Sequence, residues 1–170
     1  MNDLRVGWGF DVHPLTGVPP VILGGVLVDL ERGVEATSDG DVAAHAVCDA
    51  VLGAATLGDL GLHFPSSDRR WQGVSGLELV RRSVSLAGEA GVIPTFVDVT
   101  VVAQEVRVGP HRDAIRAGLA NALGLAVAAV SVKATTTDGL GLVGRNEGIA
   151  AMAVVTTRLG RPEIDGDPSS

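Results

Sequence analysis

The sequence predicts an α+β fold (mixed α/β), in which one mixed β-sheet packs against helices. Segments with the two-residue alternation of strands recur along the chain and are separated by segments of helical length. Their order is strand, hairpin, two helices, strand, helix and two strands, which favours a mixed sheet covered by helices. No repeat or linker divides the 170 residues, so we expect one domain over residues 1–160 and a disordered tail over 161–170.

The first predicted strand covers residues 4–13 and ends at Pro14. Its two faces differ in character, because successive side chains point to opposite sides of a strand. One face holds Val6, Trp8, Phe10 and Val12, and the other holds Arg5, Gly7, Gly9, Asp11 and His13. The second face therefore ends in a carboxylate and an imidazole. Two short apolar segments, 21–23 and 26–28, flank Gly24-Gly25 and predict a hairpin or a bulged strand.

A helix is predicted around His45. Ser38 or Asp39 is suited to cap its first turn, and the apolar run that follows ends near Gly58. Asp41, His45 and Asp49 are spaced four residues apart, so they share one face of this helix. A histidine on an apolar helix is costly to bury without a partner, although a surface stripe of i,i+4 pairs gives the same spacing.

The second half of the chain contains further predicted helices and strands. Ser75 and Glu78 have the spacing of a capping box at the start of a helix. Pro110 suits the first position of another helix, which Gly124 ends. The helix that begins after Ser75 is expected to end at Gly91. The remaining expected elements are strands over 96–104, 130–137 and 148–157 and loops over 59–68 and 138–145.

Composition limits the classes of partner. The formal net charge of -7 disfavours nucleic acid and anionic membranes, and the aromatic content of 3% argues against base-stacking surfaces. Charged residues make up only 19%, against about 25% in an average domain, which suggests that other subunits cover part of the surface. We expect no targeting or membrane segment, because the longest uncharged run, 117–132, is shorter than the roughly 18 residues of a membrane helix. The lone Cys48 excludes an intramolecular disulfide and fits a cytoplasmic protein.

The first candidate site joins the end of the first strand to the helix around His45. If that helix packs on the polar strand face, Asp11, His13 and His45 converge. Three nitrogen and oxygen ligands that leave one position open are typical of catalytic zinc, and Asp49 is placed to orient an imidazole. The same triad suits non-haem iron, although nothing in the sequence indicates an oxygen or electron pathway. An exposed strand end beside an unrelated histidine is the other interpretation that the spacing allows.

The second candidate site follows Lys133. A strand that ends in Thr135, Thr136 and Thr137 and continues into Asp138-Gly139 can donate to phosphate oxygens and offer one ligand to Mg²⁺. The same residue types also occur in ordinary strands and turns.

Two further sites are disfavoured. Asp39-Gly40-Asp41 is too short for a calcium loop. Ser38 lies in no nucleophile elbow, so it does not indicate a hydrolase.

Together these segments resemble the family of 2-C-methyl-D-erythritol 2,4-cyclodiphosphate synthases. The matching motifs occur in the family's order over about residues 5–155: Gly9-Phe10-Asp11-Val12-His13, Ser38-Asp39-Gly40-Asp41 with His45, Leu57-Gly58-Asp59-Leu60-Gly61, Phe64-Pro65, Ala103-Gln104, Pro110-His111, Lys133 to Asp138, Leu140-Gly141, Gly144-Arg145 and Glu147-Gly148. The resemblance implies a metal-dependent phosphorus-oxygen lyase of the non-mevalonate route to isoprenoids. Such an enzyme converts 4-diphosphocytidyl-2-C-methyl-D-erythritol 2-phosphate to the cyclic diphosphate and CMP. It also implies a homotrimer with active sites between neighbouring subunits.

The resemblance assigns roles to individual residues. It implies that Asp11, His13 and His45 hold zinc, that Asp138 holds a second ion, Mg²⁺ or Mn²⁺, and that Thr136 supports the transition state. It implies a cytidine pocket contributed by the adjoining subunit. The residues expected to bind substrate are Asp11, Val12, His13, Thr37, Ser38, Asp59, Leu60, Gly61, Phe64, Ser66, Asp68, Ala103, Arg107, Val108, Gly109, Ala134, Thr135, Thr136, Leu142 and Arg145. The resemblance leaves open an isoprenoid diphosphate at the trimer axis.

Four features depart from the family pattern. Thr37 stands where the family usually has a histidine that steadies the transferring phosphate, and a hydroxyl carries no charge, so we expect lower turnover. Asp138 replaces the usual glutamate and is one methylene shorter, so the second ion is expected to shift or to bind through water. Val106 and Arg107 replace proline and lysine in the cytidine loop, and Leu142 replaces a common aromatic residue. None of these changes touches the zinc triad.

Overall fold

The computed structural model describes residues 4–160, which form a four-stranded sheet, a two-stranded hairpin and a set of helices. The strands are β1 (Leu4–Pro14), β2 (Val21–Leu23), β3 (Val26–Asp29), β4 (Val92–Val102), β5 (Val130–Thr135) and β6 (Gly148–Leu159). The helices are α1 (Val42–Ala54), α2 (Leu60–His63), α3 (Gly76–Glu89), α4 (Arg112–Leu123) and α5 (Gly141–Gly144), with 3₁₀ turns at Arg69–Trp71, Gly109–His111 and Val127–Ala129. The tail expected over 161–170 lies outside the described residues.

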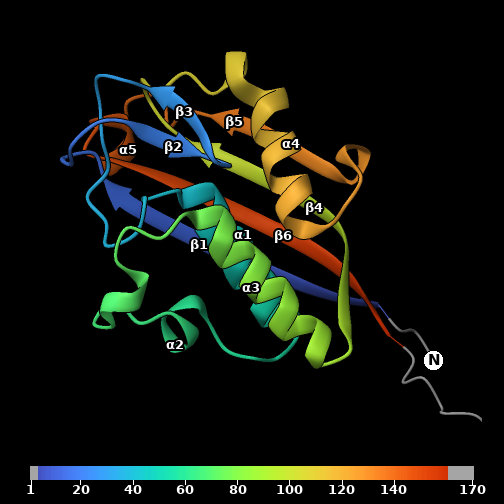
Figure 1. The fold of residues 1–170 in the computed structure, drawn as a ribbon. Helices are drawn as coiled ribbons and strands as arrows, with labels where there is room; N and C mark the ends of the chain where they lie inside the picture. Colours follow the sequence, from blue (N-terminus) through green and yellow to red (C-terminus); the bar gives the residue numbers. More distant parts are fainter. Residues whose placement is uncertain (1–3, 161–170) are drawn as a thin grey trace, which may run out of the picture.

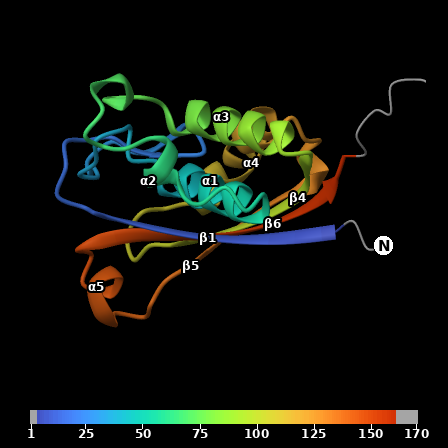
Figure 2. The ribbon, with the colours of Figure 1, turned by 90° about the horizontal axis from the view of Figure 1, so that it is seen from below.

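The main sheet is mixed, as the order of elements predicted. Its strand order is β1-β6-β4-β5, with β6 antiparallel to both of its neighbours and β4 parallel to β5. Helices α1, α3 and α4 cover one face of this sheet (Figure 1), and Figure 2 shows them together on the same side. No helix among residues 4–160 combines the length and the apolar character that crossing a membrane requires.

The core lies between the sheet and this helical layer. Alternate residues in the second half of β4, Val97, Val99 and Val101, point into it and are fully buried. Helix α1 is buried on almost all sides, because it packs against β1 and β6 and is itself covered by α3. Helix α5 lies on the opposite side of the sheet (Figure 2), where its Val143 packs against Val102, Ala150 and Met152.

Two glycines allow α1 to pack directly on β1. A Cβ atom at Gly7 would lie 1.8 Å from the Ala50 carbonyl oxygen, and one at Gly9 would lie 2.0 Å from the Ala46 carbonyl oxygen. Any side chain at either position would therefore push the helix away from the strand. This close contact brings the beginning of α1 next to the end of β1.

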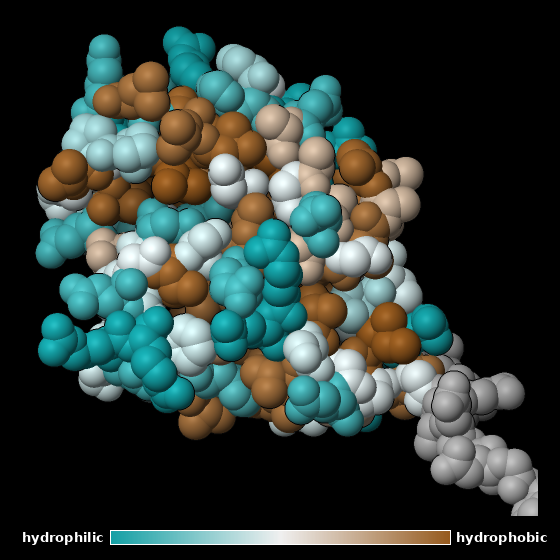
Figure 3. Space-filling model, viewed as in Figure 1, coloured by the Kyte–Doolittle hydropathy of each residue, from teal (hydrophilic) through white to brown (hydrophobic). Residues whose placement is uncertain are grey.

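The apolar face of β1 points away from the helices. Val6, Trp8 and Phe10 are 60%, 61% and 45% exposed in the isolated chain. The helix-covered side, in contrast, presents a mixture of hydrophilic and hydrophobic side chains (Figure 3). The alternation of β1 is thus confirmed, and it leaves an uncovered apolar stripe on the sheet.

Several element boundaries differ from the expectations. Asp41, rather than Ser38 or Asp39, caps α1, and this helix ends at Ala54 rather than near Gly58. Ser75 occupies the N-cap of α3, but its side chain makes no capping hydrogen bond. Gly124 ends α4 in the left-handed conformation, as expected. Strand β4 runs from Val92 to Val102 instead of 96–104, β5 ends at Thr135, and β6 ends at Leu159 instead of 157. Helix α4 begins at Arg112, after a 3₁₀ turn that contains Pro110, and the short helices α2 and α5 lie inside expected loops.

Two of these shifts follow from identified hydrogen bonds. The hydrogen bonds made by Asp39 and Asp41 delay the start of α1, and antiparallel pairing with β6 extends β4 past Pro94 toward Val92. Neither type of contact follows from the periodicity of a single segment.

Candidate functional site

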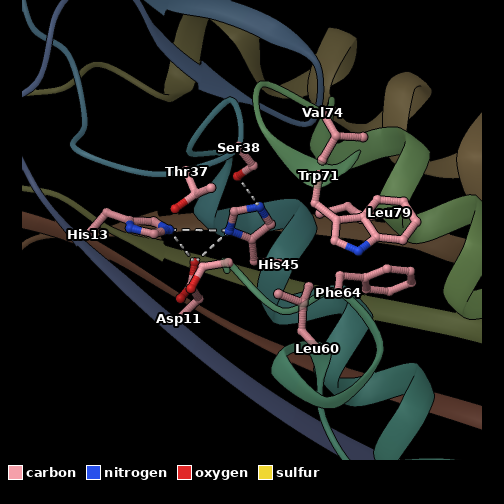
Figure 4. A pocket seen from close by; sticks show the side chains of 11 residues that line it. Asp11, His13, Thr37, Ser38, His45, Leu60, Phe64, Trp71, Val74 and Leu79 are labelled. Carbon is pink, nitrogen blue, oxygen red and sulfur yellow. Dashed lines mark hydrogen bonds and ion pairs between the residues drawn. The ribbon is translucent and has the colours of Figure 1, made fainter. Parts of the chain in front are cut away.

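Asp11, His13 and His45 meet at the end of β1. Asp11 and His13 project from the same face of the strand, and His45 lies in the first turns of α1. The Asp11 Oδ2 atom lies 3.0 Å from His13 Nε2 and 3.0 Å from His45 Nδ1, and the two nitrogens are 3.2 Å apart. Figure 4 shows the three side chains pointing toward one another. Their predicted convergence is confirmed.

The arrangement fits a single tetrahedral metal ion. Bonds of about 2.0–2.2 Å to zinc place tetrahedral ligand atoms about 3.3–3.6 Å apart. The observed separations of 3.0–3.2 Å need only small side-chain adjustments to reach that range. His45 is only 6% exposed, whereas Asp11 and His13 are half-buried along a cavity. A fourth ligand can therefore approach from that cavity.

Charge and hydrogen bonding favour an ionised Asp11. Burial raises the pKa of Asp11, but hydrogen bonds and charge from His13 and His45 outweigh it and hold the pKa well below the ordinary value of 3.8. For His45, burial lowers the pKa, but the hydrogen bond and the charge of Asp11 outweigh it and raise the pKa above 6.5. Both shifts favour a charged hydrogen bond between the His45 ring and the Asp11 carboxylate in the metal-free protein.

Ser38 orients the His45 ring. Its Oγ atom lies 3.1 Å from His45 Nε2, the nitrogen that faces away from the other two ligands. A contact of this kind fixes which ring nitrogen is free to bind a metal. The structure gives Asp49, from which this role was expected, a different partner: its Oδ1 accepts from the Leu60 N–H at 2.7 Å.

Two carboxylates, the buried Asp41 and the half-buried Asp39, fix the start of α1. Asp41 caps the helix through the Ala44 N–H at 3.0 Å and also accepts from the Gly25 N–H at 2.9 Å. Burial raises the pKa of Asp41 to about 6. Asp39 accepts from the Gly76 N–H at 2.9 Å. These contacts tie the beginning of α1 to the β2–β3 turn and to the beginning of α3.

A cavity of about 160 Å³ opens beside the triad (Figure 4). Eight of its lining residues belong to the set predicted from the sequence: Asp11, His13, Thr37, Ser38, His45, Leu60, Phe64 and Ser66. Three others, Trp71, Val74 and Leu79, were not predicted and form an apolar wall. Trp71 packs edge to face against Phe64 at 5.0 Å, and the Arg82 guanidinium lies 5.2 Å from its ring centre. The signal in the sequence that could have indicated this wall was a tryptophan between the loop expected over 59–68 and the helix expected from Ser75.

A second cavity of about 390 Å³ lies beside β4 and β5. It is lined by Ala103, Gln104, Val106, Arg107, Val108, Gly109, Pro110, Ala134, Thr135 and Thr136. The structure thus gathers into one hollow all but Glu105 of the residues that the family resemblance linked to cytidine. In the described part of the chain, no residue lines both this cavity and the one beside the triad.

The other predicted site residues lie outside both cavities. Asp138 has a left-handed φ of 51°, and its carboxylate accepts from the Thr136 hydroxyl at 3.0 Å. Asp59 caps α2 through the Leu62 N–H. The lining of the two cavities also lacks Val12, Gly61, Asp68, Leu142 and Arg145; the Asp68 and Arg145 side chains instead pair with Arg70 and Glu147.

The raised pKa of His45 predicts how metal binding depends on pH. Protonated imidazole cannot bind a metal, so Zn²⁺ must displace a proton below the pKa of His45. We expect the affinity for Zn²⁺ to fall as the pH falls, with the decrease beginning above pH 6.5 and approaching tenfold per pH unit for one displaced proton. Competition titrations with a zinc chelator between about pH 8 and about pH 6 measure this slope. A constant affinity over that range would contradict the protonation of His45.

A family model and a similar known protein point to the same family. The model of the YgbB family matches residues 4–158. A 2-C-methyl-D-erythritol 2,4-cyclodiphosphate synthase of Salinibacter ruber is 50% identical over 153 residues, which make up 90% of this chain and 98% of that relative.

Two solved structures have folds similar to that of this chain. The bifunctional IspDF of Campylobacter jejuni has a TM-score of 0.89 and 36% identity, covering 92% of this chain and 42% of that one. The IspF of Plasmodium falciparum, solved as a CDP complex, has a TM-score of 0.80 and 26% identity, covering 95% of this chain and 99% of that one.

Proposed function

We propose a function from one premise: the chain belongs to the YgbB family. The proposed reaction converts 4-diphosphocytidyl-2-C-methyl-D-erythritol 2-phosphate to 2-C-methyl-D-erythritol 2,4-cyclodiphosphate and CMP. The observation that carries the proposal is the convergence of Asp11, His13 and His45 on one point. The 50% identity to a curated synthase over 90% of the chain supports the choice of substrate.

The substrate supplies both reacting groups. An oxygen of its 2-phosphate attacks the β-phosphorus and forms a new P–O bond, while the bond from that phosphorus to the oxygen of CMP breaks. The electron pair leaves with CMP, so no side chain has to act as a nucleophile. Holding both ends of one molecule in position can contribute roughly 7–11 kcal/mol to the rate acceleration. The protein therefore has two tasks, to position the phosphates and to neutralise their charge.

We propose that Asp11, His13 and His45 hold Zn²⁺ and that Asp138 holds a second ion, Mg²⁺ or Mn²⁺. The two ions would supply positive charge to the phosphoryl oxygens. The oxygen and nitrogen donors of the triad suit zinc, and a carboxylate suits the harder second ion. In a protein with a net charge of -7, local charge of this kind is what allows a polyanion to bind.

Three hydroxyl groups lie at the two proposed ion sites, on Thr136, Thr37 and Ser38. Thr136 Oγ1 donates to the Asp138 carboxylate and accepts from the Asp138 N–H at 3.1 Å. We propose that this threonine supports the transition state from a fixed position. Thr37 lines the triad cavity and can donate one hydrogen bond to a phosphate oxygen. Ser38 has the same capacity once its oxygen has accepted from His45.

The proposed active site is shared between subunits. Among residues 4–160, the cavity beside the triad and the cavity beside β5 have no lining residue in common, which is consistent with a substrate whose cytidine and phosphates are bound by two different subunits. The uncovered apolar stripe of β1 offers a surface for association. We propose a homotrimer in which residues 103–109, with Ala134 and Thr135, bind the cytidine of a substrate whose phosphates lie at a neighbouring triad.

Phosphorus NMR tests the proposal. The protein is incubated with the diphosphocytidyl substrate, Zn²⁺ and Mg²⁺, and a sample stripped of metal by a chelator serves as the control. Signals of CMP and of the cyclic diphosphate, absent from the control, are expected. Release of CMP without the cyclic product would indicate hydrolysis, and an unchanged spectrum would indicate a nucleotide-binding protein; either result contradicts the cyclase.

A further inference from the structure

The loop that lines the second cavity has little backbone support. It leaves β4 at Ala103, whose N–H donates to the Thr135 carbonyl at 3.0 Å, and the next such bond runs from the His111 N–H to the Val108 carbonyl. Within residues 4–160, the backbone of 104–107 makes no hydrogen bond to another backbone group. Its Val106 and Val108 side chains point inward, are 5% and 3% exposed, and fix how close the loop lies to the hydrophobic core. Its lateral position therefore depends on the side chains that point outward.

Glu105 makes the outward contacts of this loop. One of its carboxylate oxygens, Oε2, accepts from the Arg32 guanidinium and also from the Asn146 amide at 3.2 Å. The residues that meet here come from three separate segments: the loop after β3, the loop after β4 and the turn before β6. Figure 1 shows β3, α5 and the end of β4 at the same end of the molecule.

Both partners of Glu105 are themselves fixed. Arg32 donates from Nη1 to the Asp29 carboxylate at 2.9 Å, and its backbone N–H donates to the same carboxylate at 3.0 Å. Asn146 has a left-handed φ of 58°, and its N–H donates to the Val143 carbonyl at 2.9 Å. Because neither partner can follow the loop if it moves, their contacts define where Glu105 lies.

We propose that Arg32, Glu105 and Asn146 form a clamp that sets the affinity of this protein for the nucleotide part of its substrate. None of the three lines the second cavity, so they act as positioning residues through Ala103, Gln104, Val106 and Arg107, which do line it. This inference rests on the proposed function, in which residues 103–109 bind cytidine. A neighbouring contact from the Gly139 N–H to Gln104 Oε1, at 3.3 Å, ties the loop to the residue that follows Asp138.

The geometry requires an arginine at position 32. The two terminal nitrogens of its guanidinium reach different carboxylates, one on Asp29 and one on Glu105. A lysine has a single charged nitrogen on a flexible stem and cannot hold both in the same planar arrangement. Glu105 is half-exposed, with a side-chain exposure of 52%, so each contact is modest by itself. The effect on binding comes from ordering a loop that would otherwise have to be ordered by the ligand.

The test measures CMP binding by calorimetry and substrate kinetics on the full chain. Glu105→Ala, Arg32→Ala and Arg32→Lys are each expected to weaken CMP binding and to raise KM by roughly three- to tenfold, with kcat within about twofold of the native value. The split between KM and kcat follows because the nucleotide is held equally in the ground state and the transition state. The double variant Arg32→Ala with Glu105→Ala is expected to bind CMP no more weakly than the worse single variant.

Glu31→Ala is the matched control. It removes a carboxylate next to Arg32 that has no side-chain hydrogen bond or ion pair within residues 4–160, so CMP binding and KM are expected to stay unchanged. Native affinity in Glu105→Ala, an equal loss in Glu31→Ala, or a fall in kcat at constant KM would each overturn the clamp. A failure of the native protein to bind CMP would instead count against the proposed function, so the two ideas can be separated.

Discussion

Replacing His45 with alanine is expected to abolish zinc retention. His45 is the most buried of the three ligands, and its Nδ1 lies within 3.0–3.2 Å of the other two ligand atoms. Asp11 and His13 alone leave two protein ligands, fewer than the three that hold catalytic zinc. Because the proposed reaction needs that positive charge on a phosphate oxygen, kcat/KM is expected to fall by roughly 10³-fold or more. Metal analysis of the dialysed protein and phosphorus NMR measure the two effects.

His111→Ala is the control for this experiment. His111 lies in the 3₁₀ turn Gly109–His111, and its side chain makes no hydrogen bond or ion pair in the described part of the chain. It should keep the full zinc content of the native protein. A His45→Ala variant that stays folded and also keeps full zinc would remove His45 from the ligand set.

Adding one methyl group at Gly9 is expected to damage both the fold and the metal site. An alanine Cβ there would lie 2.0 Å from the Ala46 carbonyl oxygen and 2.7 Å from the Ala50 nitrogen, which are backbone atoms that cannot rotate away. Strand β1 and helix α1 must then separate. We expect a loss of about 3 kcal/mol in the free energy of unfolding of the metal-free protein, measured by urea denaturation.

The same separation opens the triad. Asp11 and His13 follow Gly9 on β1, whereas His45 directly precedes Ala46 on α1, so the two halves of the site move apart. Metal sites tolerate shifts of only about 0.5 Å, and we expect the Zn²⁺ affinity to fall at least about tenfold in a competition titration.

Gly53→Ala tests whether these effects are specific to the contact. Gly53 lies on the same helix, but nothing is within 4 Å of an added Cβ atom. Because alanine favours the helical conformation over glycine, this variant should be about 0.5–1 kcal/mol more stable and should bind zinc normally. Similar behaviour of Gly9→Ala and Gly53→Ala would show that the close packing of α1 on β1 does not control the site.

Local patterns in the sequence were enough to predict the ingredients of the site. The alternation over residues 4–13 put Asp11 and His13 on one face of a strand, and the apolar run after Asp41 put His45 on a helix. The order of elements predicted a mixed sheet, which the structure confirms. These properties depend on side chains a few residues apart, and such distances are fixed by the geometry of a helix or a strand.

Contacts between distant segments decided how the helices pack on the sheet and which residues surround the metal site. Gly7 and Gly9 of β1 let the backbone of α1 come closer than any side chain would allow. The helices therefore cover the polar face of β1 and leave its apolar face exposed. Ser38 rather than Asp49 reaches the His45 ring because the loop before α1 folds over the site. Trp71 becomes a wall of the metal cavity through packing against Phe64 and Arg82.

The sequence by itself thus determined which chemical groups this protein has and which local faces carry them. Tertiary structure decided which faces meet, where the cavities lie, and that Glu105 binds both Arg32 and Asn146. The physical reason is the separation along the chain of the residues that interact. Periodicity and capping are governed by neighbours along the chain, whereas close packing and long-range hydrogen bonds depend on the shape of surfaces that form only when the whole domain has folded.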